Sequence, residues 1–183
     1  MDRKDALTLV KDHVHRTNLL KHILAVEAIM RESAKYLNED VERWGILGLL
    51  HDLDFDETYD TPKLHGTRSV ELLTGKIDEE LLRAIKAHGY IYTGVKPESK
   101  MEKALIAADA VSGLIIACAL VMPRKKISEV KPENVGKRLK EKDFARNCNR
   151  EHMLFCEQIG LSWPKFAELA LRALQGINRE LDL

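Results

Sequence analysis

Six residues carry imidazole or carboxylate groups that suit a divalent metal ion: His22, His51, Asp52, His65, His88 and Asp109. Neutral imidazole and carboxylate are ligands of divalent transition metals. Any one of these histidines alone is more often a structural residue of a core or a helix end, and Asp109 alone could pair with a Lys or Arg. Their occurrence on successive predicted helices favours a metal site, because facing helices of a bundle build such sites in their core.

The elements that must position these residues are helices. Apolar residues recur every three or four positions, and only 10 Gly and 5 Pro interrupt the 183 residues. No run alternates between apolar and polar residues for long enough to predict a strand, so we expect an all-α fold, an irregular helical bundle. The predicted helices cover residues 18–37, 40–50, 64–73, 78–88, 100–122, 133–140 and 149–159, with a last helix from Ser162 and loops at 53–62 and 90–97.

The candidate ligands occupy inward positions on this helix map. His22 lies on the apolar stripe of its helix, and His51 and Asp52 end the next helix. Gly45 and Gly48 lie on the turns just before that pair, where the missing side chains allow another helix or a ligand to approach closely. We therefore expect the His-Asp pair to face the interior of the bundle.

The segment 104–122 contains 19 residues with Asp109 as its only charge. A lone Asp would be costly in lipid, so we interpret the segment as a fully buried central helix and not as a membrane span. Asp109 is then a buried carboxylate that needs a partner. His65 is predicted to open one of the following helices and His88 to close another, so both can reach the same interior.

Composition limits the class of protein. Lys plus Arg and Asp plus Glu both number 29, which excludes a strongly basic nucleic-acid binder. Charged residues at 32% and apolar residues at 45% are typical of a soluble globular protein, and we expect one domain over residues 1–183. The three cysteines show no disulfide framework, so we expect a cytoplasmic protein without a membrane or nucleic-acid partner.

The ordered set of six residues resembles the HD superfamily of metal-dependent phosphohydrolases, which is named for an adjacent His-Asp pair. The resemblance covers a core of about residues 18–122, and residues 124–183 look like a C-terminal helical extension. It implies the ligands His22, His51, Asp52 and Asp109 for a single metal. His65 and His88 fall where members with two metals place further ligands, with Asp52 as the bridge.

The resemblance implies hydrolysis of a phosphomonoester or small phosphodiester, nucleotide-derived, by a metal-activated hydroxide, with Asp52 as the catalytic residue. The imidazole ligands favour one or two ions of Mn, Fe, Co, Ni or Zn over Mg. Arg68 is the candidate for binding the substrate phosphate, because it lies one helical turn after His65. The pair is followed by Leu53-Asp54-Phe55. Some members have a lysine shortly after the pair, and others have an acid three residues after the Asp, where this chain has Phe55. The identity of the substrate therefore stays open.

Two other functions fit the same residues. Some relatives with this ligand set are di-iron oxygenases. A non-catalytic nucleotide or RNA sensor could instead use the segment 124–146, which has nine basic and four acidic residues, although without interleaved aromatic residues a charged surface is favoured. Cys148, His152 and Cys156 recur every four residues, but the two cysteines would be about 12 Å apart along a helix, too far for one metal. A half-buried helix face is the favoured interpretation of these three residues.

Overall fold

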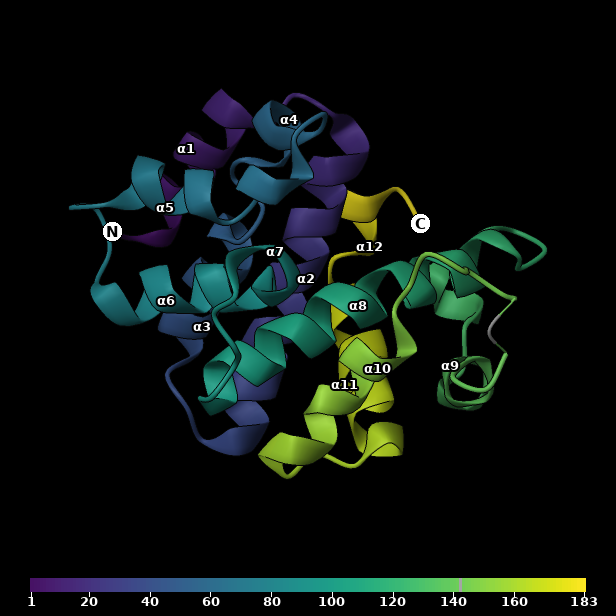
Figure 1. Ribbon diagram of the computed structural model, residues 1–183. Coiled ribbons are helices and arrows are strands. Elements are labelled where there is room, and N and C mark those ends of the chain that lie inside the picture. The colour runs from purple at the N-terminus through teal and green to yellow at the C-terminus, as the bar shows by residue number, and fades with distance from the viewer. Residues whose placement is uncertain (142) are drawn as a thin grey trace.

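The computed structural model describes residues 1–141 and 143–183, and within these ranges all regular elements are helices (Figure 1). This confirms the predicted all-α class; a single isolated bridge joins Thr74 and Ile77. The α-helices are α1 (Arg3–His13), α2 (Thr17–Leu37), α3 (Val41–Leu50), α4 (Phe55–Thr58), α5 (Thr67–Leu73), α6 (Glu79–His88), α7 (Tyr90–Thr93), α8 (Lys100–Leu120), α9 (Pro132–Arg138), α10 (Arg150–Met153), α11 (Trp163–Gly176) and α12 (Asn178–Leu181). The 3-10 helices are η1 (Pro62–Leu64), η2 (Ile127–Glu129) and η3 (Leu154–Ile159).

Helix α8 is a core helix of the fold, and most of its residues are buried. A capping box starts it, in which Ser99 Oγ accepts from the Glu102 backbone N–H and the Glu102 carboxylate accepts from the Ser99 N–H at 2.9 Å. By length and composition α8 could cross a membrane, with a mean hydropathy of 1.9, but 61% of that window is buried inside the fold. It packs against α2, α6, η3 and α10, so residues 104–122 contribute a core helix, but it is not fully buried as predicted: the helix ends at Leu120, and Leu120 and Val121 are 50% and 57% exposed.

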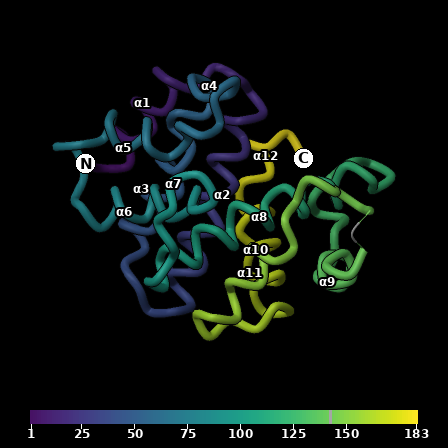
Figure 2. Tube along the Cα trace, in the orientation of Figure 1, coloured from purple at the N-terminus to yellow at the C-terminus, as the bar shows by residue number. Residues whose placement is uncertain are grey.

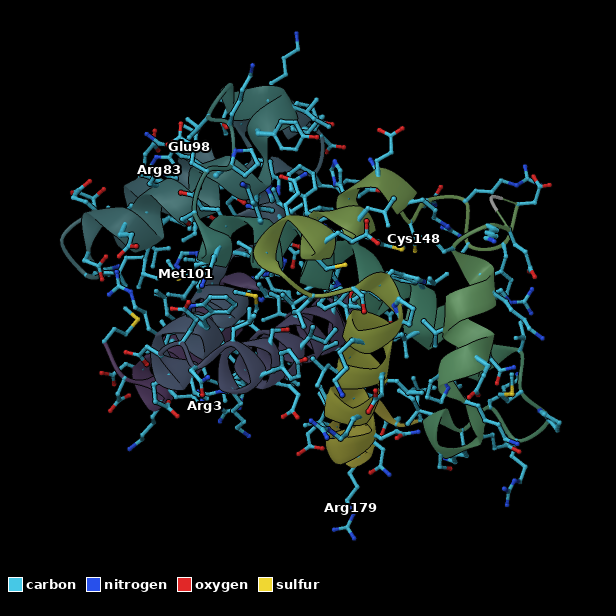
Figure 3. The ribbon with its side chains drawn as sticks, turned by 90° about the horizontal axis from the view of Figure 1, so that it is seen from below. Arg3, Arg83, Glu98, Met101, Cys148 and Arg179 are labelled. Carbon is cyan, nitrogen blue, oxygen red and sulfur yellow. The ribbon has the colours of Figure 1, made fainter. Side chains whose placement is uncertain are left out.

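Ion pairs fix the start of α8 against α6. The Arg83 guanidinium lies 2.8 Å from the Glu98 carboxylate (Figure 3) and also bonds the buried Glu102. Burial would raise the pKa of Glu102, but the bond from Arg83 and two backbone N–H groups hold it below its usual range. These contacts tie α6, which ends at His88, to the helix that carries Asp109.

Helices α2 and α3 pack closely because Gly48 has no side chain. A Cβ at this position would lie 2.8 Å from the Cα of Glu27 on α2. The neighbour is backbone and cannot move aside cheaply. The predicted close approach at Gly48 is therefore a helix-helix contact, and it sets the position of His51 at the end of α3.

Replacing Gly48 with Ala should lower the free energy of unfolding by about 2 kcal/mol, because the extra methyl group forces α2 and α3 apart. Urea denaturation followed by circular dichroism measures the change. Gly136→Ala in α9 is the matched control, since a Cβ there meets no atom within 4 Å and Ala is the better helix former. Equal stabilities of the two variants would contradict the packing argument.

The C-terminal helices pack onto this core, with α11 against α2 and α8. Arg150, at the start of α10, holds the preceding segment: its guanidinium donates to the carbonyls of Ala145 at 2.8 Å and Cys148 at 2.6 Å, and to Phe144. Helix α9 lies at the end of the molecule away from α5 and α6 (Figure 2). One apolar cluster continues from α1 to α12 through both parts of the chain.

The local structure differs from the predicted helix map in a few places. The predicted map gave no bounds for a helix before residue 18, and α1 forms there with Ala6 and Val10 as its buried residues, an apolar stripe too short to delimit from sequence. The predicted loop 53–62 contains the short α4, and the predicted loop 90–97 contains α7. His65 precedes α5 and does not open it, because Gly66 has a φ of 80° that no helix accepts.

Candidate metal centre

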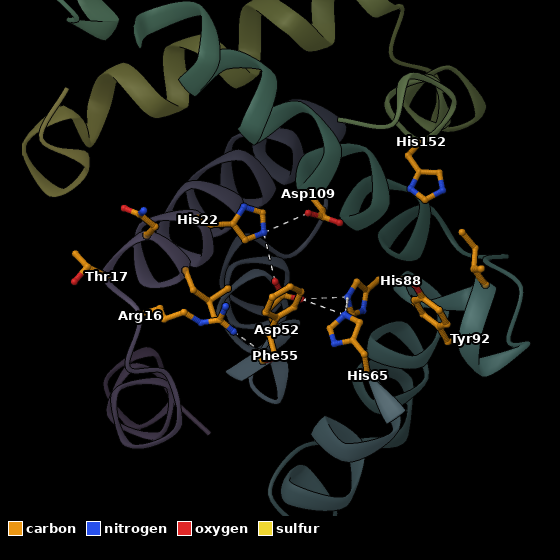
Figure 4. Close-up of a pocket in the computed structure, with 14 residues that line it drawn as sticks. Arg16, Thr17, His22, Asp52, Phe55, His65, His88, Tyr92, Asp109 and His152 are labelled. Carbon is orange, nitrogen blue, oxygen red and sulfur yellow. Dashed lines mark hydrogen bonds and ion pairs between the residues drawn. The ribbon is translucent and has the colours of Figure 1, made fainter. Parts of the chain in front are cut away.

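Asp52 lies at the centre of the site, at the turn after α3. Its Oδ1 is 3.4 Å from the Nε2 atoms of His65 and His88. Its Oδ2 is 3.5 Å from the Nε2 atoms of His22 and His51. The two oxygens of one carboxylate thus face two separate pairs of imidazoles, as Figure 4 shows for His22, His65 and His88. A carboxylate in this position could contact two metal ions at once.

The rings of His51 and His88 are held by backbone carbonyls of their own helices. His51 Nδ1 lies 2.8 Å from the Gly48 oxygen, and His88 Nδ1 lies 2.6 Å from the Ile85 oxygen. A carbonyl only accepts, so each Nδ1 carries the proton and donates it. The Nε2 of each ring then presents a lone pair to the cluster, which is the tautomer that a metal ligand requires.

The rings of His65 and His22 are held by side chains in the same way. His65 Nδ1 donates to the Asp54 carboxylate at 2.8 Å. The Ser112 hydroxyl donates its one proton to the Asp109 carbonyl at 2.8 Å, so it accepts from His22 Nδ1 at 3.1 Å. Four Nε2 lone pairs therefore converge on the carboxylate of Asp52.

This donor set fits a cation. The buried His51 Nε2 has no hydrogen-bond partner among the described residues, which is costly unless a positive charge faces it. His65 Nε2 and His88 Nε2, both lone-pair donors, are 3.0 Å apart. Two ligands at about 2.1 Å from one ion would be separated by about 3.0–3.4 Å at octahedral or tetrahedral angles. The cluster could therefore hold divalent metal.

Asp109 completes the set but is more open than predicted. Its Oδ1 lies 3.3 Å from His22 Nε2, yet its side chain is 35% exposed, whereas a fully buried carboxylate was predicted. The reason is that α8 borders a pocket at this position. Burial would raise the pKa of Asp109, but the hydrogen bond and charge of His22 outweigh it and keep the pKa below its usual range.

Burial and charge act in opposite directions on the imidazoles. Burial lowers the pKa of His51 to about 4, so this ring stays neutral at physiological pH. Burial also opposes protonation of His22 and His88, but Asp109 and Asp52 respectively outweigh it, and both pKa values are raised. Protons therefore compete with a metal ion for these two nitrogens.

The sequence model of the HD domain matches residues 19–114, more than half of the chain. The chain belongs to the HD domain family. This places it in a superfamily of metal-dependent hydrolases that bind divalent ions. No curated protein and no solved structure matches the chain. The family match ends within α8, so it includes Asp109 and excludes the C-terminal helices.

All six residues singled out in the sequence meet in this HD domain, from five different parts of the chain. Sequence reasoning gave no role to Asp54, which is fully buried beside them. Its carboxylate accepts from His65 Nδ1, from the Gly66 N–H at 2.7 Å and from the Ser69 N–H at 3.0 Å. Asp54 thus fixes the ring of His65 and the start of α5. The sequence signal that could have indicated this role is an acid two positions after Asp52, followed later by His65-Gly66.

A pocket of about 810 Å³ opens above the HD centre (Figure 4). This volume suits a small organic ligand. Part of its wall comes from the centre itself, and part from the start of α2 and from α7. The lining residues are Arg16, Thr17, Asn18, Leu19, His22, Asp52, Phe55, His65, His88, Gly89, Ile91, Tyr92, Asp109 and His152.

Arg16 is the arginine that lines this pocket, and Arg68 does not line it. The Arg68 guanidinium lies 2.8 Å from both Glu57 and Glu71. Arg68 does not share a helix face with His65, which the spacing had predicted, because His65 lies outside α5. The structure therefore places the predicted phosphate-binding arginine away from the site.

Among the described residues, Cys148, His152 and Cys156 belong to none of the groups of side chains that could hold a metal ion. Burial raises the pKa of Cys156 to about 12, so its thiol is inert. His152, however, lines the pocket and was missed, because it belongs to the extension and carries no motif. The basic segment 124–146 contributes nothing to the pocket lining, and its Lys142 lies outside the described residues.

Proposed function

We propose that this HD domain is a metal-dependent phosphohydrolase that cleaves a phosphomonoester or small phosphodiester, nucleotide-derived. The position of Asp52 carries the proposal, since each of its oxygens faces a different pair of imidazole nitrogens. Divalent ions supply charge for phosphate oxygens and lower the pKa of water towards neutrality. Asp52 would hold both ions in register and serve as the catalytic residue.

The donor atoms divide into two groups. His22, His51, Asp52 and Asp109 would hold one ion, and Asp52, His65 and His88 would hold a second. Four imidazoles favour Mn, Fe, Co, Ni or Zn over Mg, which prefers oxygen ligands and retains its waters. The same donors would serve a di-iron oxygenase, and the metal found in purified protein separates the two reactions.

Arg16 is the chain's own candidate for binding phosphate oxygens. Its guanidinium lies 4.4 Å from the ring centroid of Tyr59 and is bonded to Asp56, so it is held at the pocket wall. A guanidinium can bind two phosphate oxygens at once. Asp56 orients Arg16 at the pocket wall. The carboxylates of Glu57 and Glu71, by contrast, hold Arg68 outside the pocket.

We also infer one domain over residues 1–183, which the continuous apolar cluster supports. All three cysteines are free, which fits the proposed cytoplasmic compartment.

The test is metal analysis of purified protein followed by a panel of phosphate esters and nucleotides with each candidate metal. We expect hydrolysis, and we expect Arg16→Ala to raise KM about tenfold through loss of a charge-assisted bond. Arg68→Ala is the matched control and should leave KM unchanged. Equal effects of the two substitutions would reject the role of Arg16.

Two outcomes would replace the proposal. Mixed-valence iron with substrate oxidation indicates the oxygenase. Saturable binding of a nucleotide or RNA without turnover under any metal indicates a sensor.

A further inference from the structure

His152 is a pocket residue that the family match does not include. It comes from α10 in the C-terminal extension, beyond residue 114 where the match ends. Figure 4 places it across Asp52 from Arg16, on the side of Asp109 and Tyr92. The extension therefore supplies one wall of a pocket whose other side chains belong to the HD domain or lie next to it.

The backbone around His152 is fixed. The Asn149 side chain caps α10 by accepting from the N–H groups of Glu151 at 2.9 Å and His152 at 3.1 Å. Helix α10 also packs against α8, which carries Asp109. The position of this imidazole relative to the metal centre is thus set by packing between helices.

One nitrogen of the ring is bonded and the other is available. His152 Nε2 lies 3.2 Å from the Tyr90 hydroxyl, while no described residue bonds Nδ1. Burial lowers the pKa of His152, so the ring is neutral near pH 7. Because a hydroxyl both donates and accepts, Tyr90 allows either tautomer, and Nδ1 can accept from a ligand or donate to it.

The two ends of the pocket differ in charge. The end at Arg16 carries a guanidinium, which is ion-paired with Asp56 and can donate to phosphate oxygens. His152 lies on the side of Tyr92, an uncharged residue that is 50% exposed, and of Asp109, whose carboxylate faces His22 (Figure 4). An ester with its phosphate at Asp52 would direct its uncharged organic group towards the end at His152.

We infer that His152 recognises the organic group of the substrate, by a hydrogen bond from or to Nδ1, and so determines which esters bind. The inference rests on the proposed function for the location of the phosphate. It makes His152 a specificity-determining residue and not a metal ligand. The chemistry it would recognise is a hydroxyl or a ring nitrogen on the group attached to phosphate.

The experiment compares two probes on the full, metal-loaded chain by calorimetric titration: a nucleoside 5′-monophosphate and inorganic phosphate. His152→Ala should weaken binding of the nucleotide about tenfold and change binding of inorganic phosphate less than about twofold. His152→Asn keeps a polar atom near the position of Nδ1 and should recover part of the loss. Glu151→Ala, an exposed neighbour on α10, should bind both probes like the wild type.

Every outcome decides the inference. Equal weakening of both probes, loss of bound metal in His152→Ala, or unchanged nucleotide binding overturns it. A wild-type chain that binds neither probe overturns it too. If the probes bind as predicted but no ester is hydrolysed, the proposed function is rejected and the role of His152 is supported. If esters are hydrolysed but His152→Ala binds both probes like the wild type, the proposed function is supported and the role of His152 is rejected.

Discussion

Asp52→Asn should lower turnover of phosphate esters at least about a hundredfold and reduce the metal content of the purified protein. The substitution keeps the volume of the side chain but removes its charge. One of its two oxygens becomes an NH₂ group, which cannot bind a metal ion and would point a donor at a pair of imidazoles. Because Asp52 faces both pairs, it contacts more of the site than any other residue that the structure describes.

Asp109→Asn is the matched comparison, since Asp109 contacts His22 alone among the four imidazoles. It should cost less activity and less metal than Asp52→Asn. Helical content by circular dichroism must equal that of the wild type in both variants, so that misfolding is excluded. Near-normal turnover of Asp52→Asn at saturating metal would contradict the bridging role.

The double variant His65→Ala/His88→Ala should reduce the metal bound at saturation from about two equivalents to about one. The reason is that these imidazoles face only Oδ1 of Asp52, while the donors around Oδ2 stay intact. Elemental analysis after exhaustive dialysis measures the ratio.

His13→Ala/His15→Ala removes two histidines that do not line the pocket, and it should leave the metal content unchanged. One equivalent in the wild type, with no loss in the His65/His88 variant, would establish a mononuclear centre. In that case the catalytic role proposed for Asp52 would have to be argued without a bridge.

The convergence of the six residues could be predicted because their positions follow from helical periodicity. His22 lies three residues after Leu19 and four before the buried Val26 on α2, and a residue on such a stripe faces the interior of the bundle. The close approach of α2 at Gly48 could also be predicted, since a glycine in the middle of a helix allows another helix to approach closely. Patterns of this kind depend on one helix at a time.

Features that depend on several elements were not predictable. Arg68 was placed on a helix face shared with His65, and a left-handed Gly66 breaks that helix before it begins. The exposure of Asp109 arises because a pocket, and not another helix, lies beside it on α8. No local sequence pattern indicates where such a pocket lies. His152 reaches the pocket only through the path of the C-terminal extension.

The three bonds to Asp54 have a mechanical consequence. The Asp54 carboxylate accepts hydrogen bonds from His65 and Ser69 and so links the segment 51–54 to the segment 65–69. The distance between Asp52 and His65 is therefore kept when these segments move together. His22 belongs to a different helix and meets Asp52 only because α2 and α3 stay packed. Heat or denaturant that loosens helix packing should therefore widen the His22 side of the centre first, while the His65 side moves as a rigid unit.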